Sequence, residues 1–274
     1  MGMARGRGVY RGGGAPPLRN KEPALLPLYD RNPTRHVPVV TIGLVLVNLA
    51  VFLYMLVLSG TSADLLYYRF SVIPWEIMHA ARLPLAALRQ ALGYPVSAVP
   101  PKQVYLSLLT SMFLHDGWLH VLGNMLYLWI FGNNVEDVMG SVPFLGFYLV
   151  CGVGGTLAHV AIYPRSIGFL LGASGAISGV LGAYLLLYPR ALIYTLFFFF
   201  IVPIPAFVVI GFWILLQFFE GISSAAGGLA SGTAWFAHLG GLAVGLILTG
   251  VFLPALHRRR DALQAMPPRH WFQG

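Results

Sequence analysis

The stretch PVVTIGLVLVNLAVFLYMLVL, residues 38–58, decides the class of fold. It contains no charged side chain, and a helix of this length can cross the roughly 30 Å hydrocarbon core of a bilayer. The whole chain of 274 residues agrees with it, because 57% of the residues are hydrophobic and 9% are charged, against about 25% charged in a soluble domain. The composition predicts a multi-pass membrane protein. It excludes a disordered chain, a nucleic-acid-binding protein and an ordinary cytosolic enzyme.

Further apolar segments predict an all-α membrane protein built as a six-transmembrane-helix bundle. The predicted spans cover about residues 38–58, 118–134, 142–162, 171–188, 203–220 and 232–253. Residues 104–114 are also apolar, so a count of seven spans stays open. Pro203 and Pro205 indicate the start of the fifth helix, since proline is tolerated in a first helical turn.

Basic residues gather at the two ends of the chain. Residues 1–37 contain seven of the 17 lysines and arginines and predict a flexible N-terminal tail, and residues 254–274 predict a short C-terminal tail. Positive charge favours the cytoplasmic side, so we expect both termini there and an even number of spans. The membrane domain then covers residues 38–253, and residues 59–117 form a long outer loop of short amphipathic helices. In a prokaryote, the protein would lie in the plasma (inner) membrane.

Polar side chains in three of these spans fall at a similar depth below the outer face. The second span has His120 and Asn124, the fourth opens with Ser174, and the sixth has His238 close to its start. All three spans run in the same direction, from outside to inside, in the six-span arrangement. Because polar groups inside the hydrocarbon are costly and often functional, this coincidence predicts a site.

These residue types are suited to nucleophilic attack on a peptide bond. Serine becomes a nucleophile when a base removes its proton, and His238 is the candidate base for Ser174. His120 and Asn124 are four residues apart and share a helix face, so they can complete an oxyanion site with the backbone N–H groups beside Ser174. Because no Asp or Glu lies at this level in the fourth or sixth span, a Ser–His dyad is favoured over a triad.

Glycines in two spans predict how the serine and the histidine meet. Gly175 and Gly179 lie on one side of the fourth span, and Gly241 and Gly245 form a small-residue pair in the sixth. Small faces allow two helix backbones to approach closely. Such an approach would bring the two side chains within hydrogen-bond reach.

The sequence resembles the rhomboid family of intramembrane serine proteases over about residues 38–253. The resemblance rests on Gly172-Ala-Ser-Gly175, His120-x-x-x-Asn124 and Ala237-His-x-x-Gly241, with Asn48 and the run Asn134–Gly140 in support. It implies a six-helix core in which Ser174 is the nucleophile, His238 the general base, and His120, Asn124 and the Ser174 amide the oxyanion site. It also implies cleavage of transmembrane protein substrates near their outer ends in the lipid bilayer, without a metal or other cofactor.

Some positions depart from the family's pattern. Where many members have Trp-Arg in the first loop, this chain has Leu106 and Ser107. Where many bacterial members have a tyrosine stacked on the catalytic histidine, it has Ser178, so the group that orients His238 is left open. By the same resemblance, the fifth span and the loop 221–234 correspond to the substrate gate and the cap above the site.

Other functions stay open at this stage. A non-catalytic rhomboid-like protein that binds membrane clients would share the fold, although such proteins typically lack the serine or the histidine. A transporter is disfavoured because the chain has no strong internal repeat. The His-Glu-x-x-His motif of zinc proteases and the paired intramembrane aspartates of aspartyl proteases are absent from the sequence. Glu136 and Asp137 are expected to be solvated or to cap a loop.

Overall fold

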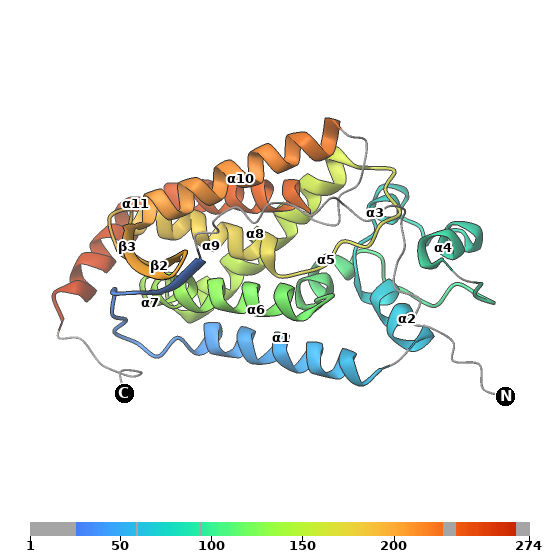
Figure 1. Cartoon of the computed structure of the whole chain (residues 1–274), viewed down its shortest axis with the longest axis horizontal. Helices are drawn as coiled ribbons and strands as arrows, with labels where there is room; N and C mark the ends of the chain where they lie inside the picture. The colour runs from blue at the N-terminus through green and yellow to red at the C-terminus, as the bar shows by residue number, and fades with distance from the viewer. Residues whose placement is uncertain (1–25, 59, 94, 227–233, 267–274) are drawn as a thin grey trace.

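The computed structural model describes residues 26–58, 60–93, 95–226 and 234–266 (Figure 1). This part of the chain is mostly helical and includes a three-stranded sheet. Its elements are β1 (Leu26–Asp30), α1 (Val39–Val57), α2 (Thr61–Phe70), α3 (Pro74–His79), α4 (Leu85–Leu92), α5 (Ser107–Thr110), η1 (Ser111–Phe113), α6 (Trp118–Tyr127), η2 (Leu128–Gly132), α7 (Asn133–Met139), α8 (Ser141–Ile162), α9 (Ser174–Leu187), β2 (Leu192–Phe197), β3 (Phe200–Pro205), α10 (Ala206–Ala226) and α11 (Trp235–Gln264).

Helices occupy each of the segments that hydropathy predicts to span the membrane. Among the described helices, α1, α8 and α11 are long and apolar enough to cross a membrane, and α9 and the Ala206–Phe219 part of α10 are shorter apolar helices. The second predicted span is a helix that continues from α6 through the π-helical η2 into α7. The chain is therefore a helical membrane protein, and the count of six spans stays a prediction.

The fifth predicted span begins later than the sequence indicates. Residues 192–205 form the β2–β3 hairpin, and α10 begins at Ala206. Pro203 and Pro205 lie in β3 instead of in a first helical turn. β3 is an edge strand of the sheet β1-β2-β3, where a residue without an N–H is tolerated. The hairpin separates α9 from α10 at the end of the bundle away from Ser174.

The last part of the predicted flexible N-terminal tail is structured. Residues 26–30 form β1, which pairs antiparallel with β2. Asp30, the last residue of the strand, accepts hydrogen bonds from the Tyr184 hydroxyl at 2.6 Å and from the Asn134 amide at 2.9 Å. Composition did not reveal this structure, because the partners of the segment lie far away in the sequence. Residues 1–25 and 267–274 of the two predicted tails lie outside the described residues.

Glu136 and Asp137 are buried, so the expectation of solvated side chains is wrong and the capping role is the one observed. The Glu136 carboxylate accepts the backbone N–H groups of Val40 at 2.9 Å and Thr41 at 2.7 Å. A carboxylate at the first turn of a helix satisfies N–H groups that have no partner within the helix and complements the helix dipole. These bonds fasten the start of α1 to α7.

Asp137 and Arg35 bring the two described ends of the chain together. The backbone N–H of Arg35 donates to the Asp137 carboxylate at 2.8 Å. The Arg35 Nε–H donates to the carbonyl oxygens of Leu263 at 2.9 Å and Met266 at 3.1 Å, beyond the membrane-spanning part of α11. α11 itself continues to Gln264, past the predicted end of its span at residue 253. The start of α1 and the end of α11 therefore lie at the same end of the bundle (Figure 1).

The predicted outer loop, residues 59–117, contains the short helices α2 to α5 and η1, of which α2, α3 and α4 lie at the other end of the bundle in Figure 1. Its apolar core is held by a buried ion pair in which Lys102 Nζ lies 2.6 Å from the Glu76 carboxylate. The same carboxylate accepts hydrogen bonds from the Tyr68 hydroxyl at 3.0 Å and the Leu83 N–H at 2.8 Å. This buried cluster holds the loop in a chain whose first loop lacks the family's Trp-Arg pair.

The helix α9 forms the centre of the bundle, with α8 and α11 packed against it (Figure 1). Every residue from Gly175 to Tyr184 is buried. A Cβ at Gly241 would meet the carbonyl oxygen of Gly175, and a Cβ at Gly245 would meet the carbonyl oxygen of Gly179. The predicted glycine-mediated approach of these two helices is confirmed.

The substitution Gly245→Ala tests this approach, with Gly250→Ala on the same helix as its control. A methyl group at position 245 would force α9 and α11 apart, whereas the position of a Cβ at Gly250 has nothing within 4 Å. We expect Gly245→Ala to destabilise the protein by about 1–3 kcal/mol, as overpacking does. Thermal unfolding in detergent measures the difference, and equal midpoints for the two variants would contradict the packing described above.

The substitution Asp30→Asn tests the electrostatics of the β1 anchor. Burial raises the pKa of Asp30 to about 7, although the hydrogen bonds from Tyr184 and Asn134 oppose the shift. In the unfolded chain, the carboxyl group of Asp30 has its ordinary pKa of about 4. The folded state therefore loses stability as the pH rises from about 4 to about 7, and the loss is complete above that window.

We expect the unfolding midpoint of the natural protein to fall between about pH 5 and pH 7, and Asp30→Asn to flatten this slope. The matched control is Asp261→Asn, because the Asp261 side chain is exposed and pairs with the neighbouring Arg260. A slope that survives Asp30→Asn would show that the buried carboxyl does not titrate in this range.

Candidate active site

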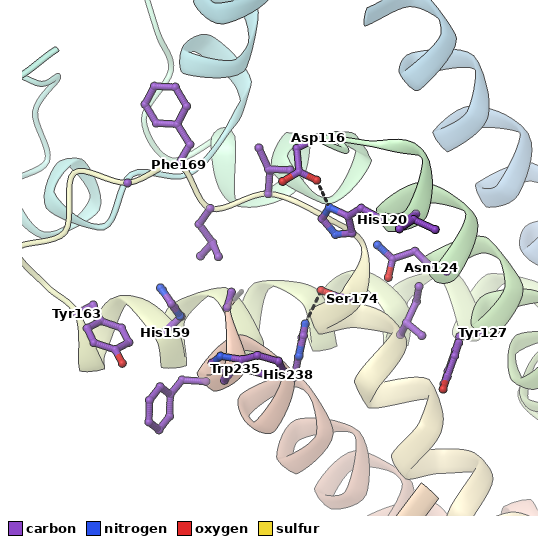
Figure 2. Close-up of a pocket in the computed structure, with 18 of the residues that line it drawn as sticks. Asp116, His120, Asn124, Tyr127, His159, Tyr163, Phe169, Ser174, Trp235 and His238 are labelled. Atoms are coloured by element: carbon purple, nitrogen blue, oxygen red, sulfur yellow. Dashed lines mark hydrogen bonds and ion pairs between the residues drawn. The ribbon is translucent and has the colours of Figure 1, made fainter. Parts of the chain in front are cut away.

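Ser174 is the first residue of α9, and an extended segment leads into it (Figure 2). Gly172 in this segment has a φ of 115°, and a Cβ there would meet the ring of His120 at 2.7 Å. Glycine is the residue that fits both this backbone conformation and this approach. The Gly172 N–H donates to the Ser111 carbonyl at 2.9 Å. The backbone thus places Ser174 beside His120, where the first N–H groups of α9 have no partner within the helix.

Ser174 and His238 form the predicted pair. His238 Nε2 lies 2.7 Å from Ser174 Oγ, as the dashed line in Figure 2 marks. His238 is 9% exposed, and the rings of Trp213 and Trp235 lie 5.9 Å and 6.1 Å from its centroid. The hydroxyl of Ser178 donates to the Ser174 carbonyl oxygen at 2.6 Å, which is a structural bond within α9. Ser178 therefore bonds the backbone of its own helix, and the indole rings of Trp213 and Trp235 are the aromatic neighbours of the imidazole.

The second nitrogen of His238 has a partner that sequence reasoning did not assign. Nδ1 lies 2.5 Å from Oε1 of Gln217, a buried residue of α10. A signal for this residue existed, because an amide inside the apolar stretch 203–220 is costly unless it is paired. Three helices, α9, α10 and α11, therefore contribute one side chain each to a continuous chain of polar contacts.

His120 and Asn124 lie on α6, on the opposite side of Ser174 from His238 (Figure 2). Asn124 Nδ2 lies 2.9 Å from Nε2 of the buried His115, and His120 Nδ1 lies 2.6 Å from the Asp116 carboxylate. Sequence reasoning did not assign a role to Asp116, although its spacing of four residues from His120 was visible. His115 and Asp116 hold the two side chains that were predicted as oxyanion donors.

The loop that precedes α6 has a defined charge state. The hydrogen bond with His120 lowers the pKa of Asp116, although burial opposes it. Burial lowers the pKa of His115 to about 4, and the neighbouring His120 adds to the shift. At neutral pH, His115 is therefore uncharged and Asp116 is a carboxylate.

One cavity of about 740 Å³ joins these groups. Asp116, His120 and Asn124 line one wall, and Ser174 and His238 line another. The remaining lining is largely apolar and aromatic, with His159 and Tyr163 from the end of α8 at the far side (Figure 2). An apolar cavity with a few convergent polar groups is the usual form of a binding site. The part of the family's cap predicted at residues 227–233 lies outside the described residues.

Comparisons with known proteins agree with this arrangement. A model of the Rhomboid domain matches residues 102–255, which is more than half of the chain. The chain is 32% identical over 176 residues to "Rhomboid protein 1, mitochondrial" of Saccharomyces cerevisiae, covering 61% of this chain and 47% of that protein. It is 32% identical over 160 residues to "RHOMBOID-like protein 12, mitochondrial" of Arabidopsis thaliana, covering 52% and 44%. It is 45% identical over 78 residues to "Rhomboid protease GluP" of Bacillus subtilis, covering 28% and 15%.

These relatives correct one expectation and establish another. The matches span less than half the length of each of the three relatives. Two of the three are named as mitochondrial proteins, so the expected location in a prokaryotic inner membrane is not supported. The range of the Rhomboid domain match includes the four predicted site residues, which line one cavity in the structure. The chain belongs to the rhomboid family.

Proposed function

We propose that this protein is an intramembrane serine endopeptidase that cleaves transmembrane protein substrates with a Ser174–His238 dyad. The observation that carries the proposal is the 2.7 Å contact between Ser174 Oγ and His238 Nε2 at the wall of the cavity. The family supports it, because rhomboid proteins act on transmembrane substrates within the bilayer. The name of the Bacillus subtilis relative describes that protein as a protease. A non-catalytic client-binding protein is disfavoured, because both residues are present and in contact.

The reaction follows from the two side chains. Ser174 Oγ attacks the carbonyl carbon of the substrate while His238 Nε2 accepts the hydroxyl proton. The C–N bond of the tetrahedral intermediate breaks, and His238 gives the proton to the leaving amine. Water then attacks the acyl-enzyme with His238 again as the base, which releases the carboxylic acid and regenerates the Ser174 hydroxyl.

The negative charge on the oxygen of the tetrahedral intermediate requires hydrogen-bond donors close to Ser174. The Asn124 amide has two N–H groups, so it can bond the uncharged His115 and still donate one N–H to the oxyanion. His120 contacts Asp116 through Nδ1, so donation from Nε2 requires a proton on both ring nitrogens. The Ser174 amide at the start of α9 is the third proposed donor.

We also propose that α1, the continuous helix α6–η2–α7, α8, α9, α10 and α11 are six membrane spans. Both described ends of the chain lie at one end of the bundle, as the bonds from Arg35 to Leu263 and Met266 support. Because segments rich in lysine and arginine favour the cytoplasmic side, the basic termini would place that end of the bundle on the cytoplasmic side. The dyad then lies near the opposite face, next to the outer loop. Cleavage would occur near the outer end of a substrate span.

Replacement of the nucleophile tests the proposed activity. Ser174→Ala removes the attacking oxygen, so we expect cleavage of a labelled transmembrane substrate by purified protein in detergent to be lost. The control is Ser71→Ala, which alters another buried serine that does not line the cavity. If Ser174→Ala cleaves at the natural rate, the protease assignment fails. If neither the natural protein nor the control cleaves and Ser174 resists a fluorophosphonate probe, the client-binding alternative is favoured.

Replacement of the oxyanion donors tests the roles of α6. We expect His120→Ala and Asn124→Ala each to lower kcat by about 10² to 10³-fold, because each removes one donor to the developing charge. KM should change little, since the bonds form mainly in the transition state. Steady-state cleavage rates over a range of substrate concentrations separate the two constants. An unchanged kcat in both variants would remove these residues from the oxyanion site.

A further inference from the structure

The proposed reaction requires His238 to hold its single proton on a particular nitrogen. A neutral imidazole carries one N–H, and the nitrogen without it is the one that accepts a proton. Nε2 faces Ser174 Oγ at 2.7 Å, so it has to be unprotonated when the serine proton is transferred. The proton must then lie on Nδ1, where it needs a hydrogen-bond acceptor.

The structure supplies one acceptor for that proton. Gln217 Oε1 lies 2.5 Å from His238 Nδ1, and the Gln217 side chain is 6% exposed. Asp116, the acidic residue that lines the cavity, is bound to His120 on α6. The amide oxygen of Gln217 therefore occupies the place that a carboxylate has in a Ser–His–Asp triad.

We propose that Gln217 is the positioning residue of the dyad, which holds His238 with its proton on Nδ1 and Nε2 free for Ser174. The inference rests on the proposed function, since it names the group that prepares the base for the same reaction. Gln217 is not among the residues that line the cavity, and it acts through His238. Gln217 would thus orient His238 in a chain that has Ser178 where many bacterial members of the family have a tyrosine stacked on the histidine.

The position of Gln217 links two helices to the chemistry. Gln217 lies on α10 and His238 lies on α11, while Ser174 starts α9. The rings of Trp213 and Trp235 flank the imidazole, so packing and the hydrogen bond to Gln217 fix different aspects of its geometry. The rings restrict the tilt of the imidazole, and the amide selects the protonated nitrogen. A change in the seating of α10 would therefore disturb the base directly.

Nitrogen-15 NMR of the eight histidines tests the inference without any need for catalysis. The His238 signals are assigned by comparison with His238→Asn. We expect a protonated Nδ1 and an unprotonated Nε2 in the natural protein. Gln217→Leu, which removes the acceptor at similar volume, should shift the population toward the other tautomer, whereas Gln217→Glu should keep the proton on Nδ1. Thr249→Val is the matched control, because Thr249 is a buried polar residue of α11 outside the cavity.

Kinetics of the same variants give the second readout. In a soluble triad, loss of the correct tautomer lowers kcat by about 10⁴-fold, and we expect Gln217→Leu to lower it by about 10² with KM nearly unchanged, since the group lost is neutral. Gln217→Glu should restore turnover. Its pH–rate profile should have an acidic limb at higher pH, because a neighbouring carboxylate favours the protonated imidazole. Thr249→Val should match the natural protein in rate and profile.

The outcomes separate this inference from the proposed function. An unchanged His238 spectrum and kcat in Gln217→Leu would overturn the role of Gln217, as would a natural protein with its proton on Nε2. If Gln217→Leu does not fold, an unchanged pH–rate profile in Gln217→Glu overturns it. A tautomer that responds to Gln217→Leu in a protein that cleaves nothing would support the placement of the proton while the protease assignment fails.

Discussion

The backbone contact between α9 and α11 is the constraint on which the candidate site depends. Gly241 and Gly245 lie against the carbonyl oxygens of Gly175 and Gly179, so that no side chain fits between the helices. Without water to drive helices together in a bilayer, close van der Waals packing of this kind supplies much of the association. The dyad lies directly beside this contact: the serine precedes Gly175 and the histidine lies three residues before Gly241. A separation large enough for a larger residue would also separate the proposed nucleophile and base.

Polar groups at the opposite end of the bundle follow a different logic. There, the carboxylates of Glu136 and Asp137 accept backbone N–H groups at the start of α1 and in the segment before it. Such bonds fix the ends of helices and leave the apolar faces free to pack. In the cavity, by contrast, the polar side chains bond one another. The contacts of His238 with Ser174 and Gln217 cross between helices, and those of His120 and Asn124 join α6 to the loop before it. The first set stabilises the fold, and the second set keeps reactive groups in register.

Hydropathy predicted where the helices lie, and the cost of polar groups in hydrocarbon predicted Ser174 and His238. Both signals are local, so one sequence was enough to read them. β1 and the hairpin were not predicted, because strand pairing joins residues 26–30 to residues 192–197 and leaves no local period in an apolar run. Gln217 was missed for a similar reason. Its partner lies 21 residues away on another helix, and neither apolar segment carries a local pattern that shows which residue of the other it will contact.

A dyad supported by an amide suits the medium in which it lies. In the proposed reaction, a buried carboxylate would stabilise the histidinium of the transition state more strongly, but it would have to be kept charged in a low dielectric in the resting protein. An amide oxygen requires far less desolvation free energy and still selects the tautomer of His238. The carboxylate of the site, Asp116, lies instead just before α6, where it is bound to His120 and the chain leaves the predicted outer loop. The arrangement confines charge to the edge of the bundle and leaves a neutral base in its interior, which is the distribution that hydrocarbon tolerates.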